Sequence, residues 1–357
     1  MSSTATPQIS WFREIGINDR PSVGGKGASL GELIKAGIRV PDGFVVTTAA
    51  FWQFLNVIDP DRSICTAIET LPPGDLTAIQ NTGAGIRQRI EQAPIPDNIR
   101  HAISDAYRQL CAGRKNLPVA IRSSATSEDS AEASFAGLQD TYLWIRDEEE
   151  VLHRVRTCWA SLYSTESISY RLRLQLPEQH LAMGVVVQQM VNSLCSGVMF
   201  TRSPTTGDKS VVTLEGSWGL GSSIVSGEVT PDRYVINKVT GEIKVRSVAM
   251  KAIQHTPSAK GGTIEEEVPA EKQGIPCLFD EQIMELVRIA KQIERHYGCP
   301  QDIEWAIARE EQTAAAGVYL LQSRPETVWA AKEIKPVASP KPKAFDHMFS
   351  VLGRKNK

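Results

Sequence analysis

A dense set of polar side chains follows an apolar run near the middle of the chain, in the stretch "VAIRSSATSEDSAEASFAGLQDTYL" of residues 119–143. Arg122 emerges from a segment that reads as a buried strand, so it needs an anionic partner. Gly137 would let the backbone close over a ligand. The hydroxyl groups between them could donate hydrogen bonds to phosphate oxygens; they belong to Ser123, Ser124, Thr126 and Ser127. The alternative is a serine-rich surface loop.

A lysine lies within the glycine-rich stretch "VGGKGASLGELIKAG" of residues 23–37. A P-loop would need glycine six positions before Lys26 and serine or threonine directly after it, where this chain has Arg20 and Gly27. The later "GLGSSI" of residues 219–224 lacks the third glycine of a dinucleotide-binding fingerprint. Lys26 therefore lies on a flexible turn beside a helix start, where it either reaches an anion or is solvated.

Two short strands near the C-terminus, predicted over "QDIEWAIA" (301–308) and "VYLLQSRP" (318–325), place charged residues on one face. Strand alternation puts Asp302 with Glu304 on the first strand, and Leu320 with Gln322 and Arg324 on the second. A carboxylate and an amide oxygen suit Mg²⁺, and an adjacent arginine suits the charge that develops on a transferred phosphoryl group. The alternative is a plain cross-strand pair of glutamate and arginine.

Weaker signals lie between these regions. The run "VVVQQMV" of residues 185–191 reads either as a core strand or as a strand that leads to a hinge near a nucleotide base. In the second interpretation the base-side residues are Gln188, Gln189, Met190 and Val191. The six histidines, His255 among them, lie outside exposed glycine- and serine-rich loops, so we expect structural or surface roles for them.

The elements that must position these residues alternate between helices and strands. Residues 60–116 are expected to be mostly helical, residues 149–173 one long helix, and residues 279–298 a helix capped by Asp280 and closed by Gly298. A hairpin with a turn at Thr240 and Gly241 is predicted over residues 232–248. This order favours an α+β fold of two lobes over one doubly wound sheet.

Composition excludes several classes of protein. The 357 residues carry 39 basic and 41 acidic side chains, and the resulting net charge of −2 gives no sign of general nucleic-acid binding. No apolar run approaches the roughly 20 residues of a membrane span, and the N-terminus lacks a secretory signal, so we expect a cytoplasmic protein without membrane contact. The six scattered cysteines predict free thiols rather than a zinc site.

Taken together, "VGGKGASLGELIKAGIRVPDGFVVTTAAF", "VAIRSSATSEDSAEASFAGLQDTYL", "GSWGLGSSIVSGEVTPDRYVI" and "DIEWAIA…VYLLQSRPET" resemble the nucleotide-binding domain of the phosphoenolpyruvate synthase and pyruvate phosphate dikinase family, over about residues 11–328. Rifampicin phosphotransferase shares that domain. The resemblance implies an ATP-grasp fold with ATP between two lobes and Mg²⁺ on its phosphates. The implied parts are an N-terminal lobe (1–185) with the phosphate-binding residues, a C-terminal lobe (186–328) with the adenine and Mg²⁺ sites, and a Lys/Pro-rich tail (329–357).

The resemblance also implies a role for each matching residue. Lys26 and Arg122 correspond to the phosphate-binding pair, Gly137 and Thr141 to the loop over the phosphates, and Gln188 to Val191 to the adenine-side strand. Glu304 and Gln322 correspond to the metal ligands, while Arg324, with Arg122 and Lys26, acts on the transferred phosphates. One departure is Ser222, which stands where the family commonly has an acid.

Relatives of full length carry two further units: a swivelling domain with a phosphorylated histidine, and an acceptor-binding domain. No histidine of this chain has the expected context, so we expect an ATP-dependent phosphotransferase of the dikinase type that passes phosphate in trans to a histidine on a partner subunit, with AMP and phosphate as products. Phenylphosphate synthase, whose acceptor is phenol, has such a separate subunit. The alternatives are a fragment or stand-alone relative of phosphoenolpyruvate synthase or rifampicin phosphotransferase, and a non-catalytic ATP sensor.

Overall fold

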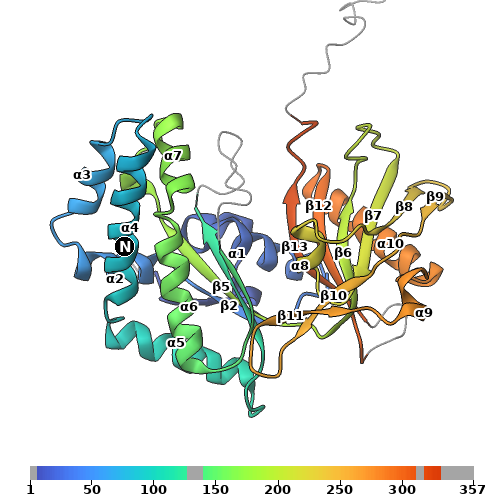
Figure 1. The fold of residues 1–357 in the computed structure, drawn as a ribbon, viewed down its shortest axis with the longest axis horizontal. Helices are drawn as coiled ribbons and strands as arrows, with labels where there is room; N and C mark the ends of the chain where they lie inside the picture. Colours follow the sequence, from blue (N-terminus) through green and yellow to red (C-terminus); the bar gives the residue numbers. More distant parts are fainter. Residues whose placement is uncertain (1–5, 127–139, 311–316, 331–357) are drawn as a thin grey trace, which may run out of the picture. The chain divides into compact units, whose positions relative to one another are not determined.

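The protein is built on two antiparallel sheets with helices packed against them (Figure 1). The computed structural model describes residues 6–126, 140–310 and 317–330. The described residues as far as Glu326 form one compact unit. All pairings between neighbouring strands of the two large sheets are antiparallel, which confirms the α+β class predicted from the sequence.

The first sheet has five strands and carries most of the helices of the N-terminal half. Its strand order is β1 (Ile9–Trp11), β2 (Gly43–Val46), β5 (Met183–Gln189), β3 (Val119–Ala125) and β4 (Thr141–Ile145). The associated helices are η1 (Phe12–Glu14), η2 (Ile17–Asp19), α2 (Thr48–Ile58), α3 (Ser63–Glu69), α4 (Leu76–Gln92), α5 (Asp97–Cys111), α6 (Glu148–Ser161), α7 (Thr165–Leu174) and η3 (Glu178–His180).

Helices α6 and α7 correct the single long helix predicted over residues 149–173. The chain turns after Ser161, and the Ser164 hydroxyl caps α7 by accepting a hydrogen bond from the Ser167 backbone N–H at 3.1 Å. A serine N-cap favours a new helix start, and this signal competes with the helical periodicity that runs through the whole segment.

The second sheet has six strands in the order β13 (Val318–Pro325), β12 (Gln301–Ala308), β6 (Ser193–Phe200), β7 (Val211–Trp218), β8 (Asp232–Asn237) and β9 (Ile243–Ser247). The predicted hairpin is present as β8–β9, with Gly241 at φ +74° in its turn. Helix α10 (Asp280–Tyr297) packs on this sheet and ends at Gly298 as predicted, but its N-cap is Phe279 rather than Asp280. The short helices α8 (Ser222–Val225) and α9 (Ala270–Gln273) complete this half.

Helix α1 (Arg20–Lys35) contributes to both hydrophobic cores. Val23 and Leu30 pack against strands of the first sheet, whereas Leu33 and the following Ile38 are buried in the core of the second sheet. The predicted division between residues 185 and 186 falls inside β5, which pairs with β2 and β3 along its length, so the sheets divide after Gln189 instead.

A two-stranded ribbon that was not predicted follows the second sheet. It consists of β10 (Ile253–Pro257) and β11 (Thr263–Glu267), and near its turn the Gly262 N–H donates a hydrogen bond to the Trp144 carbonyl of β4 at 3.2 Å (Figure 1). β10 is half-buried throughout and β11 is mostly exposed, so neither strand shows the alternation of buried apolar and exposed polar residues by which a strand is predicted from a sequence.

None of the helices in the described ranges is long and apolar enough to cross a bilayer. The cytoplasmic location expected from the sequence stays a prediction.

Candidate active site

Arg122 joins the two sheets. From β3 its Nη2 donates to Glu304 Oε2 of β12 at 2.8 Å and to Gln322 Oε1 of β13 at 2.6 Å, while its Nη1 donates to the Leu321 carbonyl at 3.1 Å. The Arg122 side chain is only 12% exposed, whereas Glu304 keeps 32% of its side-chain surface exposed to solvent. We predicted that Arg122 needs an anionic partner because it is buried, and in the structure this partner is Glu304.

Glu304 and Gln322 face each other across β12 and β13, as strand alternation predicted. The prediction was wrong for Leu320, because the register shifts between Glu304 and Trp305. Leu320 pairs with Trp305 and is buried in the core, while Leu321 packs on the other face. Such a bulge inserts one residue into one strand, so the side chains on either side of it no longer follow a single alternation.

The glycine-rich turn interrupts α1 and packs against β3. Gly24 has φ +73°, and a Cβ at this position would lie 1.9 Å from the Ser124 carbonyl oxygen, so only glycine fits without a shift. The Ser124 hydroxyl fastens the turn by donating to the Val23 carbonyl at 2.9 Å and accepting from the Gly27 N–H at 3.2 Å. Lys26 follows the turn, and its Nζ donates to the Ser123 carbonyl at 2.9 Å.

The hydroxyl groups after Arg122 bond to backbone in this structure. Ser123 donates to the Asp140 carbonyl at 3.2 Å and Thr126 to the Ala182 carbonyl at 3.3 Å. The expected contact of these hydroxyls with phosphate would require them to exchange these partners, and it stays a prediction. Ser127 and Gly137 lie outside the described residues. Thr141 is exposed on β4 and pairs with Arg122 in register.

The residues assigned to the adenine side lie at the end of β5 and just after it. Gln188 is 2% exposed, and its Nε2 has no hydrogen-bond partner in the described part of the chain. Gln189 and Met190 are half-buried, and their N–H groups donate to the carbonyls of Asp42 and Pro118 at 2.8 and 2.9 Å. Val191 is part of a small apolar cluster with Ala306, Ala308, Tyr319 and Leu321 on β12 and β13. This apolar surface borders Glu304 and Gln322 along the same strands.

Arg324 lies two pairs further along these strands, opposite Asp302. Its Nε is 3.5 Å from the Asp302 carboxylate, and its side chain is 40% exposed, so the guanidinium group remains accessible. Asp302 was placed on this face by the sequence but was not chosen as a site residue. Its position two residues from Glu304 on the same strand puts both carboxylates on one face, as alternation predicted.

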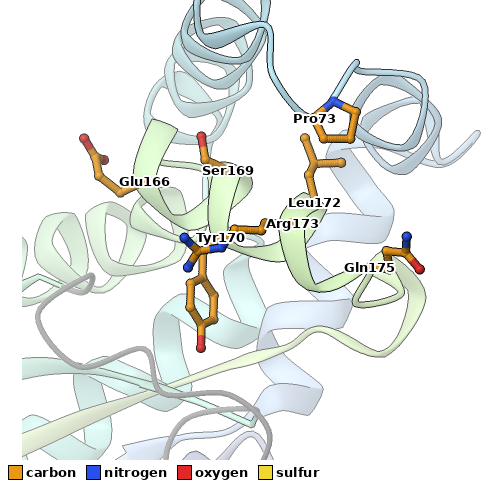
Figure 2. A pocket seen from close by; sticks show the side chains of 7 residues that line it. All are labelled: Pro73, Glu166, Ser169, Tyr170, Leu172, Arg173 and Gln175. Carbon is orange, nitrogen blue, oxygen red and sulfur yellow. The ribbon is translucent and has the colours of Figure 1, made fainter.

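Another hollow on the surface contains none of these residues. A pocket of about 550 Å³ lies along α7 beside Pro73 (Figure 2). Its lining includes Glu166, Ser169, Tyr170 and Arg173, and the Arg173 guanidinium lies 5.5 Å from the Tyr170 ring centroid. No residue predicted to act on a ligand lines it, so the candidate site is the group around Arg122.

Comparison with known proteins gives one family over most of the chain. The model of the family "Pyruvate phosphate dikinase, AMP/ATP-binding domain" matches residues 20–344. A probable phosphoenolpyruvate synthase of Methanothermobacter thermautotrophicus is 43% identical over 321 residues, which cover 89% of this chain and 46% of the relative. The phosphoenolpyruvate synthase of Aeropyrum pernix is 42% identical over 360 residues, which cover 93% of this chain and 44% of the relative. The chain thus spans about half the length of these relatives.

Similarity to solved structures is much weaker. The ADP complex of N5-carboxyaminoimidazole ribonucleotide synthetase is 10% identical and covers 72% of this chain and 58% of its own, with a TM-score of 0.27. The phosphoribosylglycinamide synthetase of Anaerococcus prevotii is 10% identical and covers 84% and 48%, with a TM-score of 0.25. Superpositions this loose support no argument about the site.

Proposed function

The chain belongs to the pyruvate phosphate dikinase family of AMP/ATP-binding domains, and we propose that it binds Mg-ATP and starts phosphoryl or pyrophosphoryl transfer to a histidine of a partner subunit. The observation that carries the proposal is the convergence of Arg122, Glu304 and Gln322 from two sheets, with Lys26 beside the same strand. A phosphate-binding cation and metal-binding oxygens in direct contact are the parts that phosphoryl transfer needs.

The oxygen donors fit Mg²⁺. Glu304 Oε2 and Gln322 Oε1 both approach one positively charged donor, Arg122 Nη2, which shows that they converge on a single point where a cation is stabilised. Carboxylate and amide oxygens are the hard ligands that Mg²⁺ prefers. Glu304 and Gln322 would hold the ion, which would neutralise charge on the bound phosphates.

Binding of Mg-ATP requires Arg122 to exchange partners. Its guanidinium group now neutralises Glu304, and both groups would turn to the nucleotide, Arg122 to a phosphate oxygen and Glu304 to the metal ion. Lys26 would leave the Ser123 carbonyl for a phosphate in the same way. The apolar cluster around Val191 would pack on the adenine ring, and the unpaired amide of buried Gln188 would reach a polar edge of the base.

The exposed guanidinium of Arg324 suits the charge that builds up during transfer. Formation of AMP and phosphate means that the bond between the β-phosphorus and the oxygen bridging to the α-phosphorus breaks. The attacking imidazole nitrogen forms the new bond to phosphorus, and AMP leaves with the electron pair. Of the two remaining phosphoryl groups, one passes to water and one to the acceptor, which balances the reaction.

Pyruvate is the first acceptor to test, because the two relatives described above are a probable phosphoenolpyruvate synthase and a phosphoenolpyruvate synthase. Phenol, the acceptor of phenylphosphate synthase, is the second; no residue of the described site distinguishes the two. The acceptor would bind outside this domain, in the partner that carries the histidine.

The metal ligands can be tested by calorimetric titration of the full chain with ATP and Mg²⁺. We expect Glu304→Gln to weaken Mg-ATP binding by about tenfold or more, since a ligand charge is lost. Glu281→Gln on α10 removes the same charge from an exposed position and should leave affinity unchanged. Equal affinity in wild type and Glu304→Gln would exclude the assigned metal site.

The transfer step is tested with ATP labelled on the β-phosphate and a histidine-bearing domain of a relative. Arg324→Ala should abolish labelling of the histidine and AMP formation while leaving ATP binding within about twofold. Arg295→Ala, an exposed arginine on α10, serves as the charge-matched control. Tight ATP binding by the wild type without AMP formation or labelling would contradict the proposed transfer and would fit a nucleotide sensor.

A further inference from the structure

We propose that Glu228, His255 and Glu265 form a second binding site, for a divalent transition-metal cation of the zinc class. None of these residues belongs to the candidate active site. In the described part of the chain they are the one group of three histidine, cysteine or acidic side chains whose ligand atoms all lie within 4.8 Å of one another.

The ribbon β10–β11 brings two of the three ligands together. His255 pairs directly with Glu265, so both side chains project from the same face of the ribbon. Glu228 approaches from the segment after α8, and its Oε2 lies 2.8 Å from His255 Nε2. Zinc binds nitrogen and oxygen ligands at about 2.0–2.2 Å, which separates neighbouring ligand atoms by about 3–4 Å. Side-chain adjustments of about an ångström would therefore complete the site.

The imidazole is already held in an orientation suited to a metal ion. His255 Nδ1 lies 2.7 Å from the Ser222 hydroxyl, and the His255 carbonyl accepts a hydrogen bond from the Leu220 N–H at 2.9 Å. An Nδ1–H that donates to Ser222 leaves the lone pair of Nε2 pointing at the carboxylates, which is the usual arrangement of a metal-binding histidine. Ser222 thus has a neutral hydroxyl that supports this tautomer.

Charge favours a divalent cation over a plain ion pair. Two carboxylates meet one imidazole, so a protonated His255 would neutralise only one of them, and Glu265 would remain as excess negative charge. A divalent cation neutralises both carboxylates while the histidine stays neutral. One nitrogen and two oxygen ligands suit Zn²⁺ better than Mg²⁺, because Mg²⁺ prefers oxygen ligands throughout.

The position of the site gives the cation a structural role. It would fasten the middle of β10 to the segment that follows α8, and the turn of the same ribbon contacts Trp144 on the first sheet. A bound cation would therefore stiffen the one described β-ribbon that reaches from the second sheet to the first.

The test is titration of the full chain with Co²⁺, a spectroscopic substitute for Zn²⁺, followed by displacement with Zn²⁺. We expect one equivalent of Co²⁺ with visible d–d absorption and no thiolate charge-transfer band, and no competition from Mg²⁺. A Cys65→Ser, Cys299→Ser background removes the two cysteines that are not buried. Burial raises the pKa of the Cys158 and Cys277 thiols, which keeps them protonated and poor as ligands.

Glu265→Gln is the sharpest variant, because Glu265 is exposed and its loss should not disturb folding. We expect Glu265→Gln and Glu228→Gln each to weaken Co²⁺ binding by about 10- to 100-fold. Glu266→Gln removes the same charge from the opposite face of the same strand and should leave affinity within about twofold. Circular dichroism of each variant checks that the fold is retained.

The proposal is overturned if the wild type fails to bind Co²⁺ or Zn²⁺. It is overturned equally if Glu265→Gln and Glu266→Gln bind alike, since binding would then follow general surface charge. Because the readout is metal absorption, it is independent of ATP binding at the candidate active site.

Discussion

Two ion pairs of this protein differ in what surrounds them. Lys251 and Asp232 are fully buried, and their 2.6 Å contact is completed by the backbone N–H groups of Ala249 and Cys277, which donate to the same carboxylate at 2.9 and 2.8 Å. Arg122 and Glu304 come from different sheets and keep 12% and 32% of their side-chain surface exposed. The first pair has its partners within one half of the molecule, whereas the second links the two sheets and is partly exposed to solvent. We expect this difference to separate a structural pair from one that can exchange its partners for a ligand.

The largest expected effect tests the structural pair. Lys251→Met should lower the free energy of unfolding by about 3–5 kcal/mol, because it leaves the buried Asp232 carboxylate without its counter-ion. Urea denaturation followed by circular dichroism measures the loss. A loss below about 1 kcal/mol, as for a surface pair, would remove the distinction between the two pairs.

The next effect concerns the turn that fastens Lys26 to β3. Gly24→Ala should destabilise the protein by about 2–4 kcal/mol, because it combines a left-handed backbone with an overlap against the Ser124 carbonyl. Gly37→Ala is the matched control: Gly37 has the same φ of +73°, but no atom lies within 4 Å of its Cβ position. Thermal unfolding of Gly37→Ala should show only the backbone strain, about 1–2 kcal/mol. Equal losses of stability in Gly24→Ala and Gly37→Ala would mean that the close approach of Gly24 to Ser124 on β3 does not add to the destabilisation.

A smaller effect on stability is expected at the functional pair. Arg122→Met should cost about 1–2 kcal/mol, less than Lys251→Met, because the remaining Glu304 carboxylate stays partly solvated. Affinity for Mg-ATP should nevertheless fall by about tenfold or more, since a phosphate-binding charge is lost. Isothermal titration and urea denaturation on the same preparation measure both. A stability loss as large as that of Lys251→Met would assign Arg122 a structural role.

The smallest effect concerns a third pair, at the surface. Glu32 accepts from the Ile17 N–H at 3.0 Å and contacts His296 Nε2 at 2.7 Å. The Ile17 N–H, assisted by His296, lowers the pKa of Glu32 below its ordinary value of 4.5. A lowered pKa in the folded state stabilises the fold above the ordinary value, and this contribution is lost as the pH falls through the folded-state value.

Glu32→Gln should therefore remove about 0.5 kcal/mol of stability at neutral pH and flatten the dependence of stability on pH between about pH 5 and 3. Denaturation curves of wild type and Glu32→Gln at several pH values check this. An unchanged slope in that window would show that the Ile17 hydrogen bond does not act on the titration of Glu32.

Part of the arrangement around Arg122 follows from the sequence alone. Alternation along β12 is sufficient to place Glu304 on the same face as Asp302, because the two faces of the strand have a distinct character. The side of Leu320 depends on how β13 pairs, and the bulge is a property of that pairing rather than of either strand. The backbone partners of the hydroxyls after Arg122 were unpredictable for a related reason: a serine that can bind phosphate can equally bind backbone, and only the folded chain shows that Gly24 lies beside Ser124.

Regions without apolar patterning were the least predictable. Residues 253–267 form the ribbon although none of their side chains is fully buried, so no periodic signal predicted it. His255 was expected to be structural or at the surface, and it is half-buried in that ribbon. Its proximity to Glu228 and Glu265 arises from strand pairing and from a loop distant in sequence, which single-sequence reasoning does not reach.

The course of α1 has a consequence for dissecting the protein into fragments. Leu33 and Ile38 belong to the first 40 residues, yet they are buried in the core of the second sheet. A polypeptide that starts after Gln189 would lack Leu33 and Ile38. The core of its sheet would then have a cavity open to solvent, so we expect that it does not fold alone. Adding back a peptide of residues 20–40 should restore that core, so this half of the molecule is best regarded as a product of complementation rather than as an autonomous domain.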